Sequence, residues 1–218
     1  MPYSPFFPTA EKLPKTLPIF PLENAVVMPQ AELPLNIFEP RYLNMVHDSL
    51  ATHHLIGMVQ PNPRFQDQGT DLCRTGCAGR ITSYSETSDG RILISLTGVC
   101  RFDIAQELDS IRGYRVIEPK WNRFLPDLEI KAINDGEDRE GVISLLKQYF
   151  LVKSLSMDWD LVEQFSTLEL IHTMAIAIPL EPMEKQAILE AEALQDRAKA
   201  LCSALEFGLQ ASSVYSKH

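Results

Sequence analysis

The sequence lacks any apolar run that approaches the length of a membrane-spanning helix. Such a helix uses ~20 consecutive apolar residues, and every apolar stretch in these 218 residues is much shorter. The first fifteen residues, MPYSPFFPTAEKLPK, also lack the basic start and continuous apolar core of a secretory signal. We therefore expect no membrane partner and a cytoplasmic location.

Cysteine is scarce, and four cysteines in a chain of this length do not make a disulfide framework. Cys73 and Cys77 are separated by three residues, and Cys100 could approach them across a sheet. A zinc site needs four convergent ligands, usually in tight pairs. Buried thiols, a metal site and a redox pair all remain open, and buried thiols fit the spacing best. We predict no metal and no cofactor, and we assign Cys202 to helix packing.

Motifs that carry catalysis are missing as well. No Gly-Lys dipeptide occurs, so the phosphate-binding loop G-x-x-x-x-G-K-[ST] is absent, and so is the nucleophile motif G-x-S-x-G. His47, His53 and His54 lie close together without an H-E-x-x-H pattern. We interpret them as surface or helix-end histidines rather than metal ligands, and we predict no catalytic residue.

Proline and charge are distributed unevenly, which divides the chain near residue 125. Eleven of the fifteen prolines precede residue 64. Residues 1–125 carry 12 Lys+Arg against 13 Asp+Glu, whereas residues 126–218 carry 8 against 16, so nearly all of the net charge of −9 lies in the second half. We predict two domains, 1–125 and 126–218.

The first half has the pattern of short strands. Asp89-Gly90 is a turn signal, because it accommodates the positive φ that hairpins require. Short strands with irregular links favour a small closed or partly closed barrel. The expected strands span 17–22, 25–28, 33–38, 55–59, 76–85, 91–97, 100–104 and 114–117.

The second half has helical periodicity. We expect a helix over 135–152, a second that begins at the N-cap Asp158 and buries Leu161, and a third that runs unbroken over 182–208 with Ala187 facing inward. Together they predict a three-helix bundle, and the fold class is α+β.

The stretch LPLNIFEPRYLNMV, residues 33–46, joins the two kinds of pattern. Pro40 suits the first position of a helix, where its missing N–H costs nothing. Glu39 at the helix entrance is favoured by the helix dipole, but Arg41 in the first turn is disfavoured by ~0.3–1 kcal/mol, so it needs a partner. Arg41 is then a structural clamp, or Phe38, Glu39, Arg41 and Tyr42 line a binding groove; a catalytic role is the third alternative.

Residues 20–46, FPLENAVVMPQAELPLNIFEPRYLNMV, resemble the opening motif of the Lon protease N-terminal (substrate-binding) domain family. Further matches are GCAGRI at 76–81, SDGRILISLTGVCRFDI at 88–104 and EKQAILEAEALQDRAKAL at 184–201. The resemblance implies a PUA-like β pseudo-barrel followed by a helical bundle. Gln30 departs from the family pattern, which usually has glycine after the proline.

The resemblance also implies a function. A full Lon protease adds an ATPase module and a serine–lysine peptidase module, and the motifs of both are absent here: Asp89-Gly90 is followed by Arg91 and Ile92, without the peptidase serine. The implied protein is a freestanding, non-catalytic module that binds unfolded or degradation-prone polypeptides, with a separate protease as a candidate partner.

Two alternatives stay open, an RNA-binding PUA-like module and an uncharacterised hydrolase. Nucleic-acid binding calls for clustered positive charge, which neither half of the chain offers. The oligomeric state cannot be predicted from the sequence.

Overall fold

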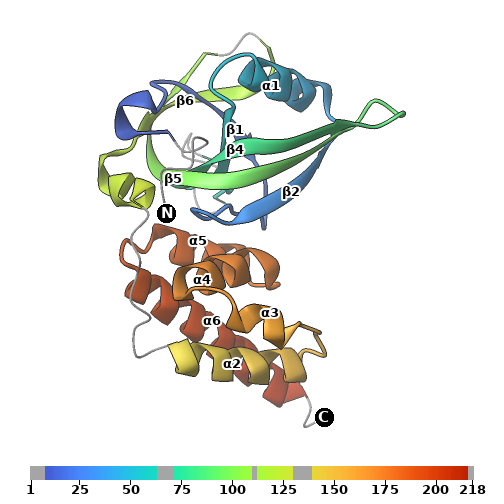
Figure 1. The fold of residues 1–218 in the computed structure, drawn as a ribbon, viewed down its shortest axis with the longest axis vertical. Helices are drawn as coiled ribbons and strands as arrows, with labels where there is room; N and C mark the ends of the chain where they lie inside the picture. The colour runs from blue at the N-terminus through green and yellow to red at the C-terminus, as the bar shows by residue number, and fades with distance from the viewer. Residues whose placement is uncertain (1–7, 63–70, 110–111, 130–138, 216–218) are drawn as a thin grey trace. The chain divides into compact units, whose positions relative to one another are not determined.

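The structure is a computed structural model that describes residues 8–62, 71–109, 112–129 and 139–215. The chain divides into two compact units, Met1–Ile130 and Lys131–His218. The first unit holds the strands, and the secondary structure in the described part of the second unit, residues 139–215, is helical (Figure 1). No helix within the described ranges is long and apolar enough to cross a membrane.

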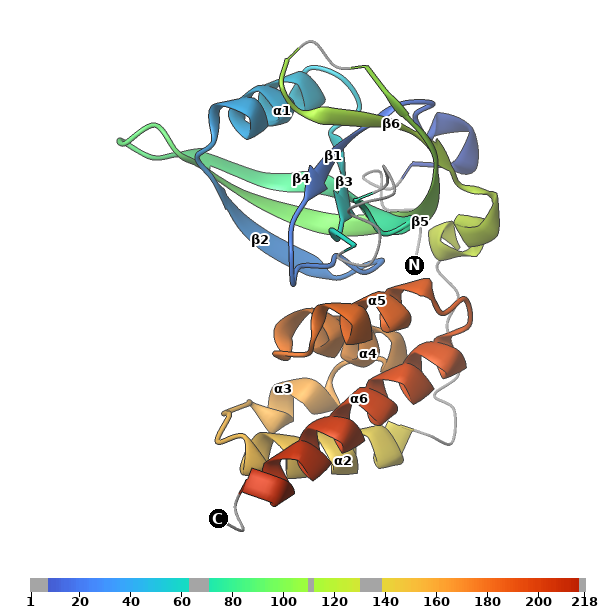
Figure 2. The same ribbon diagram turned by 180° about the vertical axis from the view of Figure 1, so that it is seen from behind.

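The first unit is built on a sheet that closes on itself. Its order is β2-β5-β4-β3-β1-β6, and β5 pairs with β6 as well, so five strands form a ring while β2 is attached to the outer edge of β5 (Figures 1 and 2). The strands are β1 (Leu17–Pro21), β2 (Glu32–Ile37), β3 (Leu55–Val59), β4 (Thr75–Glu86), β5 (Ile92–Leu108) and β6 (Arg115–Lys120); the helices are α1 (Pro40–Leu50) and the 3-10 helices η1 (Ala10–Lys12) and η3 (Asn122–Leu128).

The two strands expected over 91–97 and 100–104 are a single strand, β5. Gly98 does not interrupt it; instead, a Cβ at this position would lie 2.0 Å from the carbonyl oxygen of Met28. A glycine inside a strand often marks such a close approach of another backbone. The prediction of a strand over 25–28 was wrong. Val26, Val27 and Met28 are buried, but this segment pairs with β5 only through an isolated bridge between Pro29 and Gly98.

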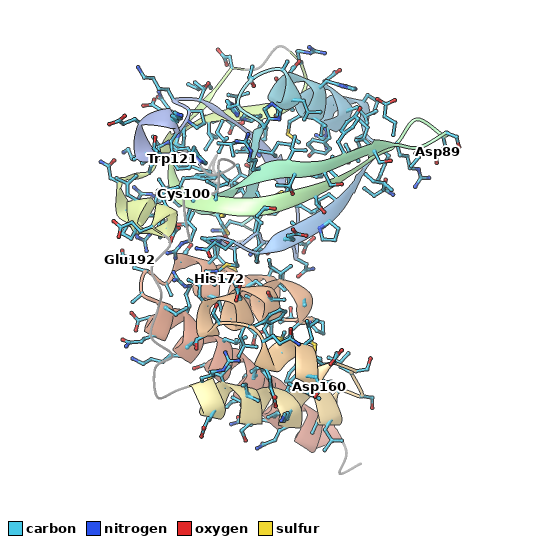
Figure 3. The ribbon with its side chains drawn as sticks, in the orientation of Figure 1. Asp89, Cys100, Trp121, Asp160, His172 and Glu192 are labelled. Carbon is cyan, nitrogen blue, oxygen red and sulfur yellow. The ribbon has the colours of Figure 1, made fainter. Side chains whose placement is uncertain are left out.

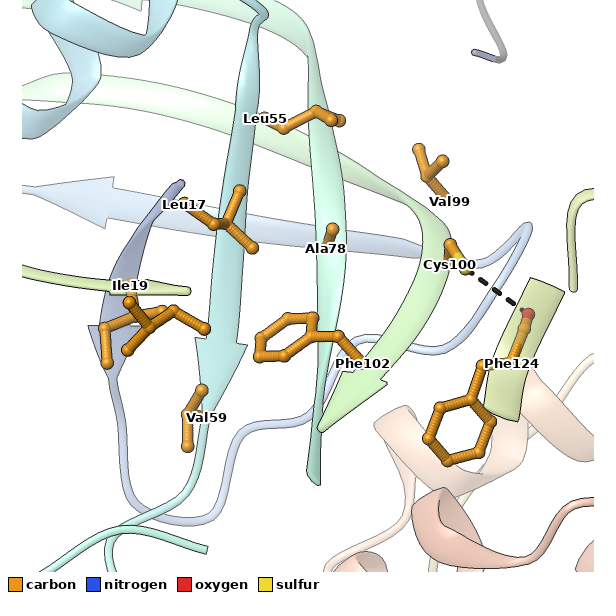
Figure 4. Close-up of a cluster of buried hydrophobic side chains, with 10 residues drawn as sticks. Leu17, Ile19, Leu55, Val59, Ala78, Val99, Cys100, Phe102 and Phe124 are labelled. Carbon is orange, nitrogen blue, oxygen red and sulfur yellow. Dashed lines mark hydrogen bonds between the residues drawn. The ribbon is translucent and has the colours of Figure 1, made fainter. Parts of the chain in front are cut away.

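The core of the barrel unit is filled by side chains from all parts of the ring. Phe102 and Cys100 of β5 lie between Leu17 of β1 and Phe124 of η3, and the Cys100 thiol donates a hydrogen bond to the carbonyl of Phe124 at 3.3 Å (Figure 4). Fully burying one such aliphatic or aromatic side chain stabilises the fold by roughly 1.5–3 kcal/mol. Figure 4 also labels the cluster members Ile19, Leu55, Val59, Ala78 and Val99, and Ile117 of β6 completes the cluster.

A buried ion pair joins β5 to η3. Arg101 is 2% exposed, and its Nε and Nη2 atoms donate to the two carboxylate oxygens of Asp127, each at 2.8 Å. The backbone N–H of Arg101 donates to the same carboxylate at 3.0 Å. Three hydrogen bonds therefore compensate the desolvation of the two charges.

The helical unit contains five helices in the described residues, not the three that were expected. Residues 135–138, where the first was expected to begin, lie outside the described residues. The helices are α2 (Arg139–Val152), α3 (Trp159–Glu163), α4 (Thr167–Ala177), α5 (Pro182–Glu190) and α6 (Leu194–Tyr215).

Both additional breaks have a physical cause. Asp158 is the N-cap of α3, as expected, but Ser166 begins a new helix because it forms a capping box with Glu169. Between α5 and α6, the guanidinium of Arg197 donates to the carbonyls of Ala191 and Glu192 at 3.3 and 3.0 Å, which satisfies groups that a continuous helix would have paired.

The breaks shift the helical phase and correct two burial predictions. Leu161 and Ala187, both expected to face inward, are exposed. Ala198, Leu201 and Leu205 of α6 are buried, as the periodicity predicted. Helices α2 and α6 approach closely, because a Cβ on Gly208 would lie 2.7 Å from the ring of Tyr149.

Candidate functional site

The junction of β2 and α1 turns the chain so that neighbouring side chains point in opposite directions. Ile37, the last residue of β2, is buried, whereas Phe38 is 61% exposed, since successive strand residues alternate between faces. Glu39 is the N-cap of α1 in an extended conformation, and Pro40 occupies the first helical turn. The proline-marked helix start predicted from the sequence is confirmed.

Arg41 forms its ion pair within this turn. Its Nε donates to the Glu39 carboxylate at 2.9 Å, and its Nη2 lies 2.8 Å from the same oxygen. The carboxylate that Arg41 was expected to need is therefore its near neighbour and not a group on another element. Both side chains are about half exposed, and the Glu39 carboxylate makes no cap bond to the helix.

Tyr42 supports this turn from beneath. Its ring is buried and packs on the ring of Phe20 with the centroids 4.2 Å apart. Burial raises the pKa of its phenol above the ordinary value. The guanidinium of Arg41 lies 4.6 Å from the Tyr42 ring centroid, so the buried ring orients the exposed cation. Of the four residues singled out from the sequence, three are at the surface and Tyr42 is in the core.

Strand β5 adds an apolar neighbour that sequence reasoning missed. Asn36 pairs with Leu93 across the β2–β5 ladder, so Leu93 and Phe38 lie on the same outer face, one step apart. Leu93 is 44% exposed. The guanidinium of Arg91 lies 5.9 Å from the Phe38 ring centroid and pairs with Asp89 at 2.9 Å. Strict alternation in RILISLT, with the isoleucines inward, was the available signal.

We call the set Phe38, Glu39, Arg41, Arg91 and Leu93 the β2–α1 surface. Two exposed apolar side chains, Leu93 on β5 and Phe38 directly after β2, lie at this surface, and each flanking arginine is neutralised by a carboxylate next to it. Asp89, the partner of Arg91, lies at the tip of the hairpin between β4 and β5 (Figure 3).

The C-terminal half of α1 forms polar contacts through Asp48. Asp48 accepts hydrogen bonds from Arg112 at 2.6 Å and from the Tyr114 hydroxyl at 2.8 Å. Burial and the bond to Asp48 raise the pKa of Tyr114 to about 12. Gly113 between them has φ +84°, and a Cβ there would lie 3.4 Å from the Cβ of Arg41. The polar contacts between α1 and the residues before β6 thus involve Asp48, in addition to the buried face of the helix, whereas Arg41 pairs with Glu39.

The cysteines form no shared site in the described residues. Cys77 pairs with Arg101 and Ala78 pairs with Cys100, so alternation places the two thiols on opposite faces of the sheet. Burial raises the pKa of both thiols, which keeps them protonated and weakly nucleophilic. None of the four cysteines forms a disulfide, and no cluster of three or more candidate metal ligands occurs in the described ranges.

The histidines are also separate from the β2–α1 surface. His47 is exposed on α1, and His53 and His54 follow the end of that helix. The Nδ1 of His53 accepts a hydrogen bond from the backbone N–H of Leu55 at 3.1 Å. His53 therefore positions the start of β3.

A known protein family matches most of this chain. The sequence model of the ATP-dependent protease La (LON) substrate-binding domain matches residues 16–206, which include the β2–α1 surface and most of both units. The chain belongs to the Lon substrate-binding domain family.

Other members of the Lon family resemble this chain over most of its length. It is 28% identical to a Lon protease of Flavobacterium johnsoniae over 86% of this chain and 23% of that protein, and 26% identical to Lon protease 2 of Myxococcus xanthus over 89% and 24%. The chain thus spans about a quarter of the length of these curated Lon relatives.

Solved Lon structures share the fold. A Lon N-terminal domain protein from Xanthomonas campestris superimposes with a TM-score of 0.60 at 21% identity, over 86% of this chain and 97% of the other. The N-terminal domain of a Mycobacterium avium complex Lon protease gives 0.63 at 14% identity, over 88% and 98%. The Lon resemblance expected from the opening motif is confirmed.

Proposed function

We propose that this Lon substrate-binding domain binds unfolded polypeptide, or segments that expose apolar side chains, through the β2–α1 surface and without cleaving them. The observation that carries the proposal is the exposure of two large apolar side chains close together: Leu93 on β5, opposite Asn36, and Phe38 directly after the end of β2. Large exposed apolar groups on a rigid frame are typical of contact sites for other chains.

The surroundings of this pair favour an uncharged ligand surface. Arg41 and Arg91 are each paired with an adjacent carboxylate, so neither side of the apolar centre presents a net charge. An apolar side chain from an extended polypeptide can bury its surface against Phe38, while its backbone bonds to the ion pairs at the rim.

Arginine pairing across the barrel unit speaks against the RNA-binding alternative. Six arginines form ion pairs with Asp or Glu: Arg41, Arg91, Arg101, Arg112, Arg115 and Arg123. A phosphate backbone would have to displace these carboxylates, whereas phosphate binding relies on unneutralised Lys and Arg.

We extend the proposal to the finer features that the Lon family implies. The closed ring of five strands with β2 at its edge supports a PUA-like pseudo-barrel, with a domain boundary near residue 125. The helical domain then packs α2 to α6 in place of a three-helix bundle. We propose that the protein acts in the cytoplasm as an adaptor that presents bound polypeptide to a separate protease.

Binding of a fluorescently labelled, permanently unfolded polypeptide, followed by anisotropy, tests the central claim. The wild type should bind in the absence of ATP, and the double variant Phe38→Ser, Leu93→Ser should weaken binding by about tenfold or more. Gel analysis of the same mixtures should show an intact polypeptide, with and without ATP. Fragments that accumulate with time in a clean preparation would overturn the non-catalytic part.

Two matched controls separate this surface from general stickiness. Phe207 on α6 is 64% exposed, a fraction similar to the 61% of Phe38. Phe207→Ser therefore removes an equally exposed aromatic ring from the other unit. Tyr84→Ser is the second control. Tyr84 pairs with Ile94 and therefore lies on the opposite face of the hairpin from Leu93. Both controls should bind like the wild type; an equal loss in either would refute the assignment. If unlabelled RNA displaced the labelled polypeptide and unlabelled unfolded polypeptide did not, the RNA-binding alternative would be favoured.

A further inference from the structure

A separate hollow lies on the barrel unit beside Trp121. It has a volume of about 410 Å³, within the range of small-ligand sites. We call it the Trp121 pocket; its lining includes the apolar residues Leu13, Leu108, Pro119 and Trp121, and two charged residues, Lys15 and Glu118, which we call its rim. In Figure 3, Trp121 lies at the opposite end of the barrel unit from Asp89, so the pocket is not part of the β2–α1 surface.

The pocket exists because the chain leaves the sheet before β1. The β1–β6 ladder ends at the pair Leu17 and Ile117. Upstream of it, the indole Nε1 of Trp121 donates to the carbonyl of Pro14 at 3.1 Å. The segment that carries Lys15 is thus held at both ends, and residues of this segment and of β6 line the hollow.

Trp121 gives the pocket a rigid apolar wall. Its ring meets Phe102 edge to face, with the centroids 5.6 Å apart and an interplanar angle of 74°. Since its N–H is already bonded to Pro14, the indole offers the pocket only apolar surface. Leu13 and Leu108 continue this surface, which suits an aliphatic or aromatic side chain.

The rim carries two charges in different states. Glu118 accepts a hydrogen bond from the amide of Gln106 at 2.7 Å. Lys15 is exposed, and in the part of the chain that the structure describes it has no carboxylate partner. Because the Gln106 amide is neutral, Glu118 keeps its negative charge, and the rim presents a positive charge at Lys15, which attracts an anion, and a negative charge at Glu118, which repels one.

We propose that the Trp121 pocket is a second polypeptide contact, which takes a bulky apolar side chain flanked by an acidic residue. The apolar side chain lies against Trp121 and Leu108, and the carboxylate faces Lys15, away from Glu118. The inference rests on the proposed function in one respect, that the ligand is a polypeptide, and it adds a sequence preference that the charge-balanced β2–α1 surface does not provide.

Trp121 itself reports occupancy. The chain has two tryptophans, and the other, Trp159, belongs to the helical unit, so the variant Trp159→Phe leaves Trp121 as the sole indole. Into this variant we would titrate a short capped alanine peptide that carries one phenylalanine followed by one aspartate. Its companions replace the aspartate by lysine, or the phenylalanine by alanine. The aspartate peptide should shift the fluorescence emission of Trp121, and this change should saturate as the peptide concentration rises. The peptide without phenylalanine should leave the emission unchanged.

Charge reversal at the rim decides the assignment. An exposed ion pair changes affinity modestly, so the aspartate peptide should bind about fivefold more tightly than the lysine peptide. Lys15→Glu should reverse this order of affinities, because it replaces the positive charge by a negative one. Since Lys15 is exposed, we expect the variant to fold normally. Equal affinities of the two peptides, an order that survives Lys15→Glu, or an unchanged emission would each overturn the proposal.

The failure of this inference is distinguishable from failure of the proposed function. If Trp121 emission never responds while the unfolded polypeptide still requires Phe38 and Leu93, the pocket falls and the function stands. If the peptides titrate Trp121 but the double variant at Phe38 and Leu93 binds unfolded polypeptide normally, the β2–α1 assignment falls and the pocket stands.

Discussion

The guanidinium of Arg41 lies 2.8 Å from the carboxylate of Glu39, two residues earlier in the same turn, with both side chains about half exposed. Exposed ion pairs of this kind contribute ~0–1 kcal/mol to stability. The pair therefore shapes the surface at the start of α1 more than it holds the helix in place.

Replacing Arg41 should accordingly separate stability from binding. We expect Arg41→Ala to lower the free energy of unfolding by less than about 1 kcal/mol, a shift of about 2–4 °C or less in melting temperature. It should weaken binding of the unfolded polypeptide, since Arg41 borders Phe38. Asp48→Ala is the matched control, because it removes the bonds from Arg112 and Tyr114 and should cost more stability. A large fall in melting temperature for Arg41→Ala would restore the clamp interpretation.

Gln30 occupies a backbone conformation that favours glycine. Its φ is +64°, and its N–H donates to the carbonyl of Gly98 at 2.8 Å, which fixes the turn. A left-handed conformation costs a residue with a Cβ roughly 1–2 kcal/mol. Gln30→Gly should therefore raise stability by about 1 kcal/mol, partly offset by the greater entropy of glycine in the unfolded chain. Gln30→Ala keeps the Cβ and should show no such gain in a thermal melt.

Gly98 should tolerate no side chain. A Cβ would lie 2.0 Å from the Met28 carbonyl oxygen, which belongs to the backbone and cannot rotate away. We expect Gly98→Ala to cost more than about 3 kcal/mol in chemical denaturation, the range of severe core changes. Gly90 offers the contrast: its φ is +83° with open space around it, so Gly90→Ala should cost only about 1 kcal/mol. Similar costs for the two would contradict the steric explanation.

Features with a local cause could be predicted from the sequence. Pro40 begins α1 because proline fits the first helical position, and Gly90 takes the positive φ of the hairpin turn. The departure noted at Gln30 likewise coincides with a positive φ. Each of these signals lies within a few residues of its effect.

Features that depend on distant residues could not be predicted. The break between α5 and α6 falls in a run of good helix formers and is stabilised by Arg197. Asp127 is 26 residues from its buried partner Arg101. The proximity of Leu93 to Phe38 follows from the register of the β2–β5 ladder. Each result needed tertiary pairing, which periodicity alone does not contain.

His53 should make the stability of the barrel unit depend on pH. Burial and the charge of His54 lower the pKa of His53 below its ordinary value of 6.5, and its Nδ1 accepts the Leu55 N–H. Protonation is easier in the unfolded chain, so the contribution to stability is present above pH 6.5 and is lost as the pH falls through the lower folded pKa. We expect unfolding midpoints in urea to fall between pH 7.5 and pH 5, and His53→Gln to reduce that fall. His47→Gln, on the exposed face of α1, should leave it unchanged; an identical pH profile for His53→Gln and wild type would remove His53 as the cause.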